Sequence, residues 1–281
     1  MGAVEVTGIF LYPVKSLRGI AVEEATVDEL GLDGDRRFMV IDGTGKMLTQ
    51  RSLPRMALVE TALAADRLIL RAEGAGETTV GRASDPAAPV RAVAVWKSAG
   101  LQTEDCGDGA ARWLADFLGV PCRLVRIGSA FARPIPTHRA YAPEGETVAH
   151  RVTFADSHPI MLLGEASLEE LNGRMRAQGE AALPMDRFRP NLVVRGGAPF
   201  AEDGWGRIRV GTVTLRGCDP CARCIITTID QRTTARGVEP LRTLATYRRD
   251  AREPTNVNFG RNFLHETKSG ALRAGDTVEL L

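Results

Sequence analysis

Short stretches of apolar and β-branched residues, separated by turn residues, dominate about the first hundred positions of the chain. Stretches of this length, bounded by Gly, Pro, Asn or Asp, are typical of β-strands. We therefore expect strands at residues 4–11, 22–27, 38–41, 57–63, 68–70 and 90–96. Regular short strands with no long helix among them favour an antiparallel barrel or sandwich.

One tight turn is predicted in this region. The segment Asp42-Gly-Thr-Gly-Lys46 lies between residues 38–41 and 47–50, and its glycines supply the positive φ that hairpin turns require. We expect a hairpin at this point.

Helical periodicity occurs at few places. Apolar residues recur at helical spacing in residues 110–118, and Gly119 follows as a stop. Ser167-Leu-Glu-Glu170 has the pattern of a capping box and predicts a helix that begins at Ser167. Glu239-Pro-Leu241 opens a third, short helix, because proline is tolerated in a first turn.

The second half of the chain again favours strands, expected at residues 191–194, 208–215, 257–263 and 277–280 and in the β-branched run after Cys224. Residues 128–150 are rich in Pro and Gly and show little periodicity. They predict a loop or linker at the junction of two units.

The composition is ordinary for a water-soluble protein. Of 281 residues, 44% are hydrophobic and 25% charged, and the formal net charge of +1 gives no reason to expect nucleic acid or a membrane as partner. Five cysteines in so long a chain do not form a disulfide framework and fit a reducing compartment. No apolar run approaches the roughly 20 residues of a membrane span, and no secretory signal is evident, so we expect a cytoplasmic protein.

Three of the five cysteines lie in one run, Cys218-Asp-Pro-Cys-Ala-Arg-Cys224. A thiolate is both a nucleophile and a soft metal ligand, so this density of sulfur indicates metal or redox chemistry. Three buried cysteines that act as small apolar side chains are the alternative. Asp219, Pro220 and Arg223 make the segment polar and turn-like, which weighs against that alternative.

The spacing of the cysteines limits the kinds of metal site that they could form. Structural zinc requires four ligands, typically from two separated pairs, and Cys106 and Cys122 do not supply a second pair. The bacterial ferredoxin run requires a fourth cysteine where Thr228 stands. Two possibilities remain: a cluster held by three cysteines and a remote ligand, or a metal held by one cysteine whose other ligands come from a cofactor.

Cationic side chains lie at the ends of several predicted strands. They occur in Lys15-Ser16, in Arg36-Arg37, in Arg187-Phe-Arg-Pro-Asn191 and at Arg223. Each alone is most simply a solvated surface charge. Together they suit an anionic ligand, because loops at strand ends display functional groups and arginine forks match phosphate. No glycine-rich nucleotide motif follows a strand, and a lone histidine such as His158 is more often structural than catalytic.

Several of these segments together resemble the MOSC superfamily. They follow one another in the order expected of a MOSC N-terminal β-barrel domain and then a MOSC domain. The matching stretches are Leu11-Tyr-Pro-Val-Lys-Ser16, Asp35-Arg-Arg-Phe38, Arg187-Phe-Arg-Pro-Asn191, Phe200-Ala-Glu-Asp-Gly-Trp205, Cys221-Ala-Arg-Cys-Ile-Ile-Thr-Thr-Ile-Asp230, Glu239-Pro-Leu-Arg-Thr-Leu244 and Asn258-Phe-Gly-Arg-Asn262. The resemblance spans nearly the whole chain and is greatest to YcbX-type proteins and mitochondrial amidoxime-reducing components.

This resemblance implies a mainly β (α+β) fold. An N-terminal β-barrel domain is expected over residues 1–125 and a MOSC β-barrel domain over residues 126–281, with a few short helices.

The resemblance also implies a molybdenum cofactor (Mo-molybdopterin), a pterin dithiolene with a terminal phosphate. By the family pattern Cys224 is the protein ligand of the metal and the catalytic residue. The cofactor-binding residues implied are Lys15, Ser16, Arg36, Ser157, His158, Arg189, Asn191, Ala222, Arg223 and Asn262.

The activity that the resemblance implies is reduction of small N-hydroxylated compounds. Cleavage of the N–O bond uses two electrons and two protons and gives an amine or amidine plus water. The cofactor carries the difficult chemistry, and the protein supplies orientation and electrostatics. Because no flavin or iron–sulfur motif is evident, we expect a separate electron-donor reductase of the flavoprotein or ferredoxin type.

Two other functions fit the same cysteine run. A sulfur-carrier or cofactor-handling protein would use a cysteine persulfide, and MOSC domains also occur in that setting. An iron–sulfur protein would use Cys218, Cys221 and Cys224 together. Iron without molybdenum would favour the second of these.

Overall fold

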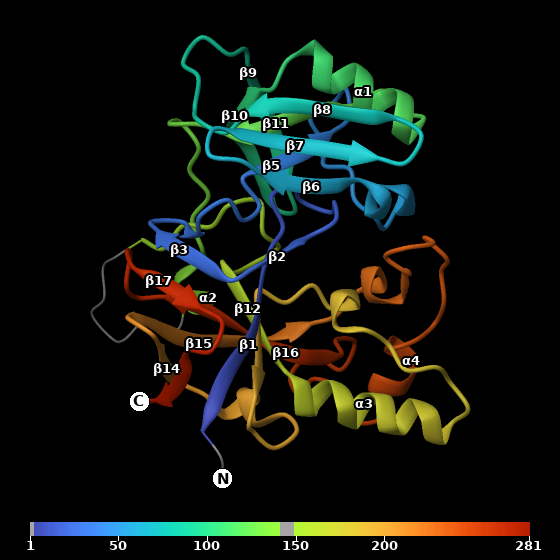
Figure 1. Ribbon diagram of the computed structural model, residues 1–281, viewed down its shortest axis with the longest axis vertical. Coiled ribbons are helices and arrows are strands. Elements are labelled where there is room, and N and C mark those ends of the chain that lie inside the picture. The colour runs from blue at the N-terminus through green and yellow to red at the C-terminus, as the bar shows by residue number, and fades with distance from the viewer. Residues whose placement is uncertain (1–2, 141–148) are drawn as a thin grey trace.

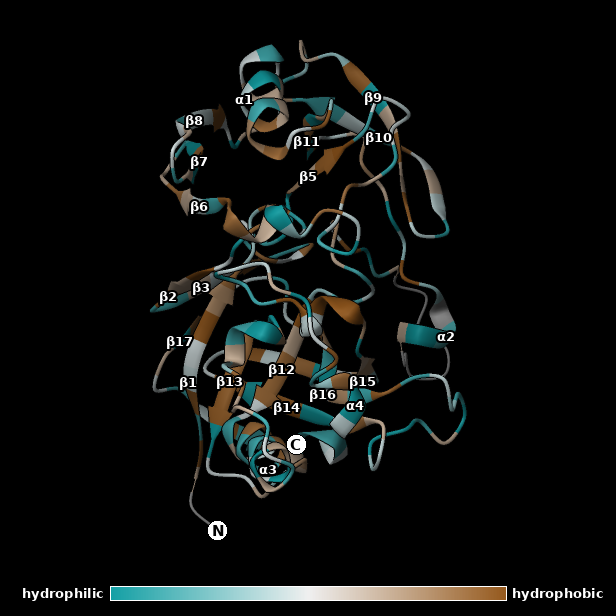
Figure 2. Cartoon of the chain, turned by 90° about the vertical axis from the view of Figure 1, so that its right-hand side faces the viewer, coloured by the Kyte–Doolittle hydropathy of each residue, from teal (hydrophilic) through white to brown (hydrophobic). Residues whose placement is uncertain are grey.

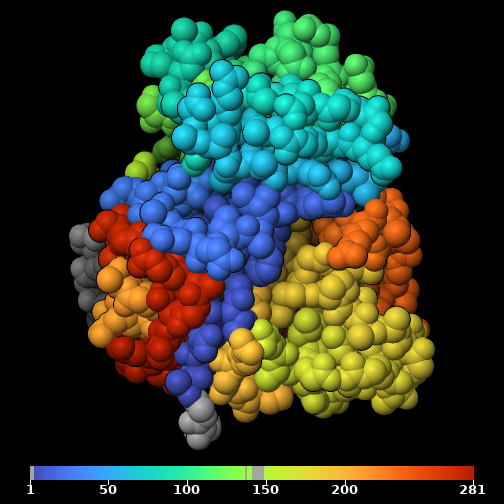
Figure 3. Space-filling view, in the orientation of Figure 1, coloured from blue at the N-terminus to red at the C-terminus, as the bar shows by residue number. Residues whose placement is uncertain are grey.

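The structure is a computed structural model that describes residues 3–140 and 149–281. It consists of two lobes stacked one on the other (Figure 1). In the space-filling view of Figure 3, the blue N-terminal segment rises between the yellow and red parts of the lower lobe and enters the cyan and green upper lobe. The predicted mainly β fold with a barrel and a few short helices is confirmed.

The lower lobe is built around a barrel, which within the described ranges has seven strands in the order β13-β12-β16-β15-β14-β18-β1 and is closed by pairing of β1 with β13. The strands are β1 (Val4–Leu11), β12 (Ile160–Gly164), β13 (Leu192–Arg195), β14 (Arg207–Val210), β15 (Val213–Ala222), β16 (Asn258–His265) and β18 (Thr277–Leu280). The first strand of the chain therefore completes a barrel made otherwise from the second half.

Apolar side chains fill the barrel, and Figure 2 shows the hydrophobic colour gathered on its strands. Leu162, Leu192, Ile208, Leu215 and Phe263 are fully buried there. The alternation of inward apolar and outward polar residues along the strands sets the register, because a shift by one residue would turn these side chains to solvent.

Parallel strands require a crossover, and α3 (Glu165–Ala177) supplies it between the parallel neighbours β12 and β13. On the outside of the barrel α3 packs with α4 (Leu241–Leu244) around Leu171, Phe188 and Phe259. The 3₁₀ helices η2 (Met185–Arg187), η3 (Ala201–Gly204) and η4 (Ile225–Thr228) lie in the connections of this lobe.

The upper lobe contains two small sheets, ordered β5-β11-β10-β9 and β6-β7-β8. Its elements are β5 (Phe38–Ile41), η1 (Pro54–Leu58), β6 (Glu60–Leu63), β7 (Arg67–Ala72), β8 (Gly76–Gly81), β9 (Val90–Val95), β10 (Ser98–Asp105), α1 (Asp108–Leu118) and β11 (Arg123–Ile127). One face of α1 buries Leu114 and Phe117 against Phe38, Leu68 and Leu124, as its apolar periodicity predicts.

The remaining elements lie at the barrel rim and between the lobes. β2 (Ile20–Val22) extends the barrel sheet from β1, and β3 (Glu24–Asp28) pairs with β4 (Gly31–Leu32) and β17 (Ala271–Arg273). The helix α2 (Thr137–Ala140) lies inside the linker predicted at residues 128–150, of which 141–148 are outside the described residues. The boundary expected between residues 125 and 126 stays a prediction. No helix in the described ranges is long and apolar enough to cross a membrane.

Three predicted strands and the predicted hairpin differ in the structure. Residues 22–27 divide into β2 and β3, and residues 57–63 begin with η1, where Pro54 opens a helical turn. Residues 208–215 divide into β14 and β15 at Gly211, whose φ of +54° suits a tight turn. The segment after the turn at residues 42–46 does not form a full second strand of a hairpin. It pairs with β5 through an isolated bridge between Met47 and Ile41.

Two further predictions are wrong for side-chain reasons. The β-branched run after Cys224 is η4 rather than a strand, because Thr227 and Thr228 bond back to the carbonyls of Cys224 and Ile225. Helix α3 begins at Glu165 and not at Ser167. The Ser167 hydroxyl donates instead to the buried Glu202 carboxylate (2.7 Å).

Candidate functional site

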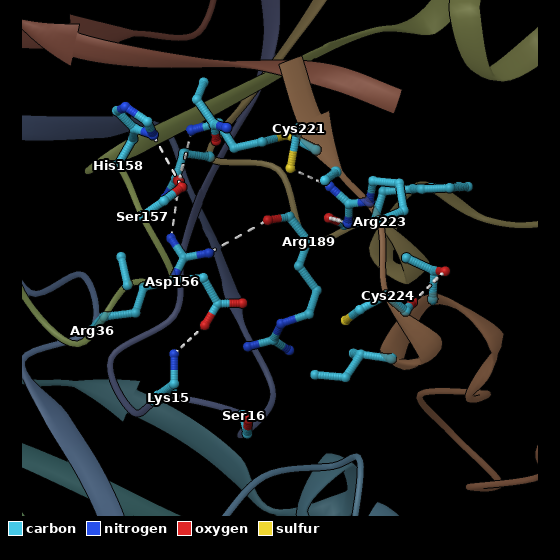
Figure 4. A pocket seen from close by; sticks show the side chains of 18 of the residues that line it. Lys15, Ser16, Arg36, Asp156, Ser157, His158, Arg189, Cys221, Arg223 and Cys224 are labelled. Atoms are coloured by element: carbon cyan, nitrogen blue, oxygen red, sulfur yellow. Dashed lines mark hydrogen bonds and ion pairs between the residues drawn. The ribbon is translucent and has the colours of Figure 1, made fainter. Parts of the chain in front are cut away.

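A cavity of about 380 Å³ lies where the upper lobe meets the barrel. All eleven residues that the sequence singled out line this cavity: Lys15, Ser16, Arg36, Ser157, His158, Arg189, Asn191, Ala222, Arg223, Cys224 and Asn262. Figure 4 shows many of their side chains converging on one space. The structure thus brings together residues from six separate segments of the chain, while their individual roles stay predictions.

Other residues that line the cavity were not assigned to the cofactor site from the sequence. The polar and aromatic ones are Arg51, Trp96, Arg139, Asp156, Cys221, Phe188 and Thr227. Two of these residues could have been predicted from their neighbours in the sequence. Asp156 directly precedes the predicted site residues Ser157 and His158, and Cys221 belongs to the cysteine run. Arg51 and Trp96 belong to the upper lobe and match no motif.

Cys224 stands between the end of β15 and the start of η4. Its carbonyl accepts bonds from the Thr227 backbone and hydroxyl, which fixes the turn that carries the thiol. Arg51 Nη2 lies 3.1 Å from the sulfur. The charged guanidinium therefore donates a hydrogen bond to this sulfur.

The other two cysteines of the run are in different environments. Cys221 also lines the cavity, where Arg223 Nη1 donates to its sulfur over 2.8 Å, but burial raises the pKa of its thiol. Cys218 is buried against Ile135, Ala140 and Leu264, away from the cavity lining.

The described residues contain no group of three or more His, Cys, Asp or Glu side chains that could hold a metal. A cluster bound by Cys218, Cys221 and Cys224 together therefore has no support in the structure. A metal at Cys224 would need ligands from another source.

The cavity is strongly cationic. Six cationic side chains line it, Lys15, Arg36, Arg51, Arg139, Arg189 and Arg223, against the single carboxylate of Asp156 among the described lining residues. Lys15, Arg36, Arg51 and Arg139 have carboxylate partners, and Arg189 and Arg223 have none among the described residues. An excess of one sign of charge in a concave site attracts a ligand of the opposite sign. This imbalance fits a phosphate-bearing ligand.

Arg189 and Arg36 both stack on the same buried ring. Their guanidinium carbons lie 4.2 Å and 4.3 Å from the centroid of Tyr12. Burial raises the pKa of the Tyr12 hydroxyl to about 12, and that hydroxyl donates to the carbonyl of Pro190. The aromatic ring therefore orients two cations toward the cavity without neutralising either one.

The two arginines differ in their partners. Arg36 Nη1 bonds to Asp35 and to the Asn191 side chain (2.9 Å). Asn191 is itself held by Met161 N and by the carbonyl of Phe10, so it positions Arg36. The Arg189 guanidinium donates to no acceptor among the described residues. Burial lowers the pKa of Arg189 to about 10, so it stays charged at neutral pH with its donors available.

Lys15 and Asp156 form an ion pair in the wall of the cavity. Lys15 also donates to the carbonyl of Phe154 (2.8 Å), and Arg133 supports the same loop through the carbonyls of Thr153 and Asp156. Burial opposes ionisation of Asp156, but Lys15 overrides it and holds the pKa of the carboxyl below its usual range. Asp156 is therefore ionised at neutral pH.

Ser157 and His158 are joined to each other and to α2. The Nε2 of His158 lies 2.9 Å from the carbonyl of Arg139, and its Nδ1 lies 3.0 Å from the Ser157 hydroxyl. Because a carbonyl only accepts, Nε2 carries the proton and Nδ1 accepts from Ser157. Burial lowers the pKa of His158, which keeps the ring neutral and suits a structural role.

Left-handed backbone conformations are concentrated at this cavity. Ser16, Arg36, Trp96 and Arg189 have φ values of 66°, 47°, 54° and 55°. Of the non-glycine residues with positive φ in the described ranges, only Phe200 and Thr234 lie elsewhere. Such conformations cost energy and are typical of functional sites, where the fold imposes them.

The two lobes are held together beside the site by a buried pair of amides. Gln50 and Gln231 exchange reciprocal bonds of 3.1 Å and 2.9 Å, and Gln50 also donates to the carbonyl of Ser16. Gln50 is fully buried and directly precedes Arg51. This contact fixes the position of Arg51 relative to the barrel.

The last two predicted residues belong to neighbouring strands. Ala222 ends β15 and pairs with Asn258 of β16. Asn262 lies further along β16 and pairs with Met161 of β12. Both are carried by the rigid barrel wall, which is a favourable place for a binding site.

Comparison with known families agrees with this geometry. Residues 3–121 match the MOSC N-terminal beta barrel domain, and residues 149–279 match the MOSC domain. The chain therefore belongs to the MOSC superfamily, and it carries both domains.

Among similar proteins are ones named for amidoxime reduction or for the molybdenum cofactor. Mitochondrial amidoxime-reducing component 1 is 34% identical to this chain over 290 residues in Mus musculus and over 300 residues in Homo sapiens, and each alignment covers 98% of this chain and 82% of the relative. The molybdenum cofactor sulfurase of Danio rerio is 30% identical over 276 residues, which are 93% of this chain but 32% of that protein.

Proposed function

We propose that this protein is a molybdenum-cofactor-dependent oxidoreductase that reduces N-hydroxylated compounds with electrons from a separate reductase. The observation that carries the proposal is that Cys224 lines a cavity whose described lining residues include six cations and one carboxylate. The similarity to two amidoxime-reducing components over most of their length supports it.

The donors in the cavity fit such a cofactor. Arg189, with no protein acceptor among the described residues, and Lys15 would bind the phosphate. Arg36, held in place by Asn191, would contribute a second guanidinium. Cys224 would be the protein sulfur ligand, and its charge is balanced by Arg51. Bidentate guanidinium donors are well matched to phosphate oxygens.

When bound, the cofactor would supply the two-electron redox chemistry that removes oxygen from nitrogen. The residues of this chain would hold the group and orient it. In the balanced reaction, an N–OH compound, two electrons and two protons give an N–H compound and water. The electrons would come from a flavoprotein or ferredoxin-type reductase.

The test is reduction of benzamidoxime by protein produced in a host that makes the cofactor. Reduced viologen serves as the electron donor, so that no partner protein is required. We expect substrate-dependent oxidation of viologen and formation of benzamidine, and no activity in Cys224→Ser. Cys218→Ser is the matched control, because Cys218 is buried outside the cavity and should leave most activity intact.

A sulfur-carrier function is the second candidate, and the similarity to a molybdenum cofactor sulfurase favours it. It would use a persulfide on a cavity cysteine, Cys224 or Cys221. Molybdenum-loaded protein that reduces neither benzamidoxime nor other N-hydroxylated compounds would overturn the reductase proposal. Sulfane sulfur on Cys224 under the same conditions would then support the carrier function.

A further inference from the structure

The loop that leads into β12 carries Asp156 and Ser157, which both line the cavity. It lies directly beside two of the cations that would bind a phosphate. The backbone N–H of Phe154 donates to the carbonyl of Arg36 (3.1 Å), and Lys15 donates to the carbonyl of Phe154 (2.8 Å). Figure 4 shows Asp156 and Ser157 at the same space as these two cations. The backbone of this loop is therefore part of the cationic site.

Arg133 binds the same loop, although it is not part of the cavity lining. Its Nη1 donates to the carbonyls of Thr153 (2.9 Å) and Ala155, and its Nη2 donates to the carbonyl of Asp156 (3.0 Å). The residue is 5% exposed, and among the described residues it donates to these carbonyls and to no carboxylate. A buried charge without a counter-ion is costly, so fixing these carbonyls must bring a benefit elsewhere in the site.

The carbonyls of Ala155 and Asp156 point to the same side of the chain, because both accept from the guanidinium of Arg133. In an extended chain, successive carbonyls point to opposite sides. Both peptide bonds are trans, and in a trans peptide unit the N–H points opposite to the C=O. The N–H groups that follow these carbonyls, those of Asp156 and Ser157, therefore both point away from Arg133.

Two consecutive N–H groups on one side of the backbone form a concavity that binds anions. Neither the N–H of Asp156 nor that of Ser157 donates to an acceptor among the described residues. Asp156 and Ser157 line the cavity and Arg133 does not, so the side away from Arg133 is the cavity side. The loop thus presents two backbone donors to the site, beside Lys15 and Arg36.

The carboxylate of Asp156 does not close this concavity to an anion. One of its oxygens accepts from Lys15 and from the indole Nε1 of Trp96 (3.1 Å), and the other lies 3.6 Å from Arg51 Nη2. Both oxygens are therefore engaged by other groups, and two cations compensate the negative charge.

We propose that Arg133 is a positioning residue, which turns the backbone N–H groups of Asp156 and Ser157 into the cavity as a binding site for a phosphate group. Arg133 acts through the carbonyls that it holds and does not touch the ligand. The inference rests on the proposed function, in which the phosphate is that of the molybdenum cofactor. A free phosphate ion has the same chemistry, and measurements with each distinguish the two sources.

The amide signals in the NMR spectrum of the full chain test the assignment without any variant. The probe is inorganic phosphate, titrated into isotope-labelled protein that carries no cofactor. We expect the amide proton signals of Asp156 and Ser157 to move downfield and to saturate, because a charged acceptor strengthens the hydrogen bonds that they donate. Phosphate that binds without moving these two signals, or no binding of phosphate at all, would overturn the assignment.

Phosphate binding by variants tests the part played by Arg133. Arg133→Ala frees the carbonyls, so it should raise the Kd for phosphate about tenfold and remove the response of the two amide signals. Arg133→Lys keeps a cation that can donate to the carbonyls and should recover part of the affinity. Arg126→Ala is the matched control, because Arg126 is also buried and bonds to a backbone carbonyl, that of Gly81 (3.0 Å), but lies outside the cavity.

Equal affinity in Arg133→Ala and the wild type, or an equal loss in Arg126→Ala, would contradict the role of Arg133. If Arg133→Ala does not fold, the response of the amide signals in the wild type decides.

Protein loaded with the cofactor distinguishes the source of the phosphate. We expect pterin retention after dialysis to fall in the order wild type, Arg133→Lys, Arg133→Ala. Equal pterin retention despite unequal phosphate affinity would overturn the use of this site by the cofactor. Protein from a cofactor-producing host that holds no pterin would contradict the proposed function, while the phosphate titration would still decide the role of Arg133.

Discussion

The guanidinium of Arg51 lies 3.1 Å from the sulfur of Cys224, although the two residues are 173 positions apart in the chain. Arg51 belongs to the upper lobe, and Cys224 follows a strand of the barrel. The buried pair of Gln50 and Gln231 fixes this relationship, because it joins the lobes at the residue next to Arg51. The environment of the thiol is therefore a product of both lobes.

Arg51→Ala should lower turnover with benzamidoxime about 10- to 100-fold, because a hydrogen bond to a charged group contributes about 1.5–3 kcal/mol. Arg51→Lys should retain part of the activity, since it keeps the charge. The comparison requires variants with equal molybdenum content. A turnover number for Arg51→Ala equal to that of the wild type would show that the contact with Cys224 has no role in the reaction.

Arg189→Ala should deplete the bound pterin more than Arg36→Ala does. The reason is that the Arg189 guanidinium has no acceptor among the described residues, whereas Arg36 is partly neutralised by Asp35. Loss of one charge-assisted contact weakens binding about 10- to 100-fold. The measurement is the pterin content that each variant retains after dialysis, determined from the fluorescence of the oxidised pterin.

Arg209→Ala is the control for this experiment, because Arg209 lies on β14 outside the cavity and pairs with Glu279 at the surface. Equal pterin retention by Arg189→Ala and Arg209→Ala would remove Arg189 from the binding site.

Asp105 should make the stability of the upper lobe sensitive to acid. Its carboxylate is buried and bonds to Arg123, Arg91 and the Gly107 N–H. Burial opposes ionisation, but these donors override it and lower the pKa of Asp105 to about 2. A carboxyl whose pKa is lowered by folding stabilises the protein above its unfolded pKa, and that stabilisation is lost as the pH falls from about 4 toward 2.

Asp105→Asn should therefore reduce the free energy of unfolding at pH 6 by about 2 kcal/mol, with a smaller difference at pH 3. Urea unfolding at the two pH values measures this. Asp66→Asn, at an exposed position, should show neither effect. A difference for Asp105→Asn that stays constant between pH 6 and pH 3 would contradict the lowered pKa.

Much of the fold could be predicted from local pattern. The strand Phe38–Ile41 and the helix at residues 110–118 form as their periodicity indicates. The wrong predictions occur where a side chain bonds to a partner that the pattern does not indicate, either far away in the chain or in the neighbouring backbone. Ser167 has the sequence of a helix cap, but its hydroxyl bonds to Glu202, which lies 35 positions away. The run after Cys224 has strand-forming residues, but local hydroxyl bonds turn it into η4.

The site was predictable only where residues belong to a family motif. Motif matching found Lys15, Arg36 and Cys224, all of which line the cavity. Arg51 and Trp96 could not be found in this way, because each lies in a turn of the upper lobe that no motif includes. Their approach to Cys224 depends on how the lobes pack, and local sequence carries no signal for that.

The most direct test of the account is X-ray absorption at the molybdenum edge of the purified protein, with Cys218→Ser and Cys224→Ser measured alongside. The account predicts about one molybdenum per chain. It also predicts the same sulfur coordination in the wild type and Cys218→Ser, and one sulfur ligand fewer in Cys224→Ser. Protein without molybdenum from a cofactor-producing host, or unchanged sulfur coordination in Cys224→Ser, would contradict the assignment of Cys224 as the metal ligand.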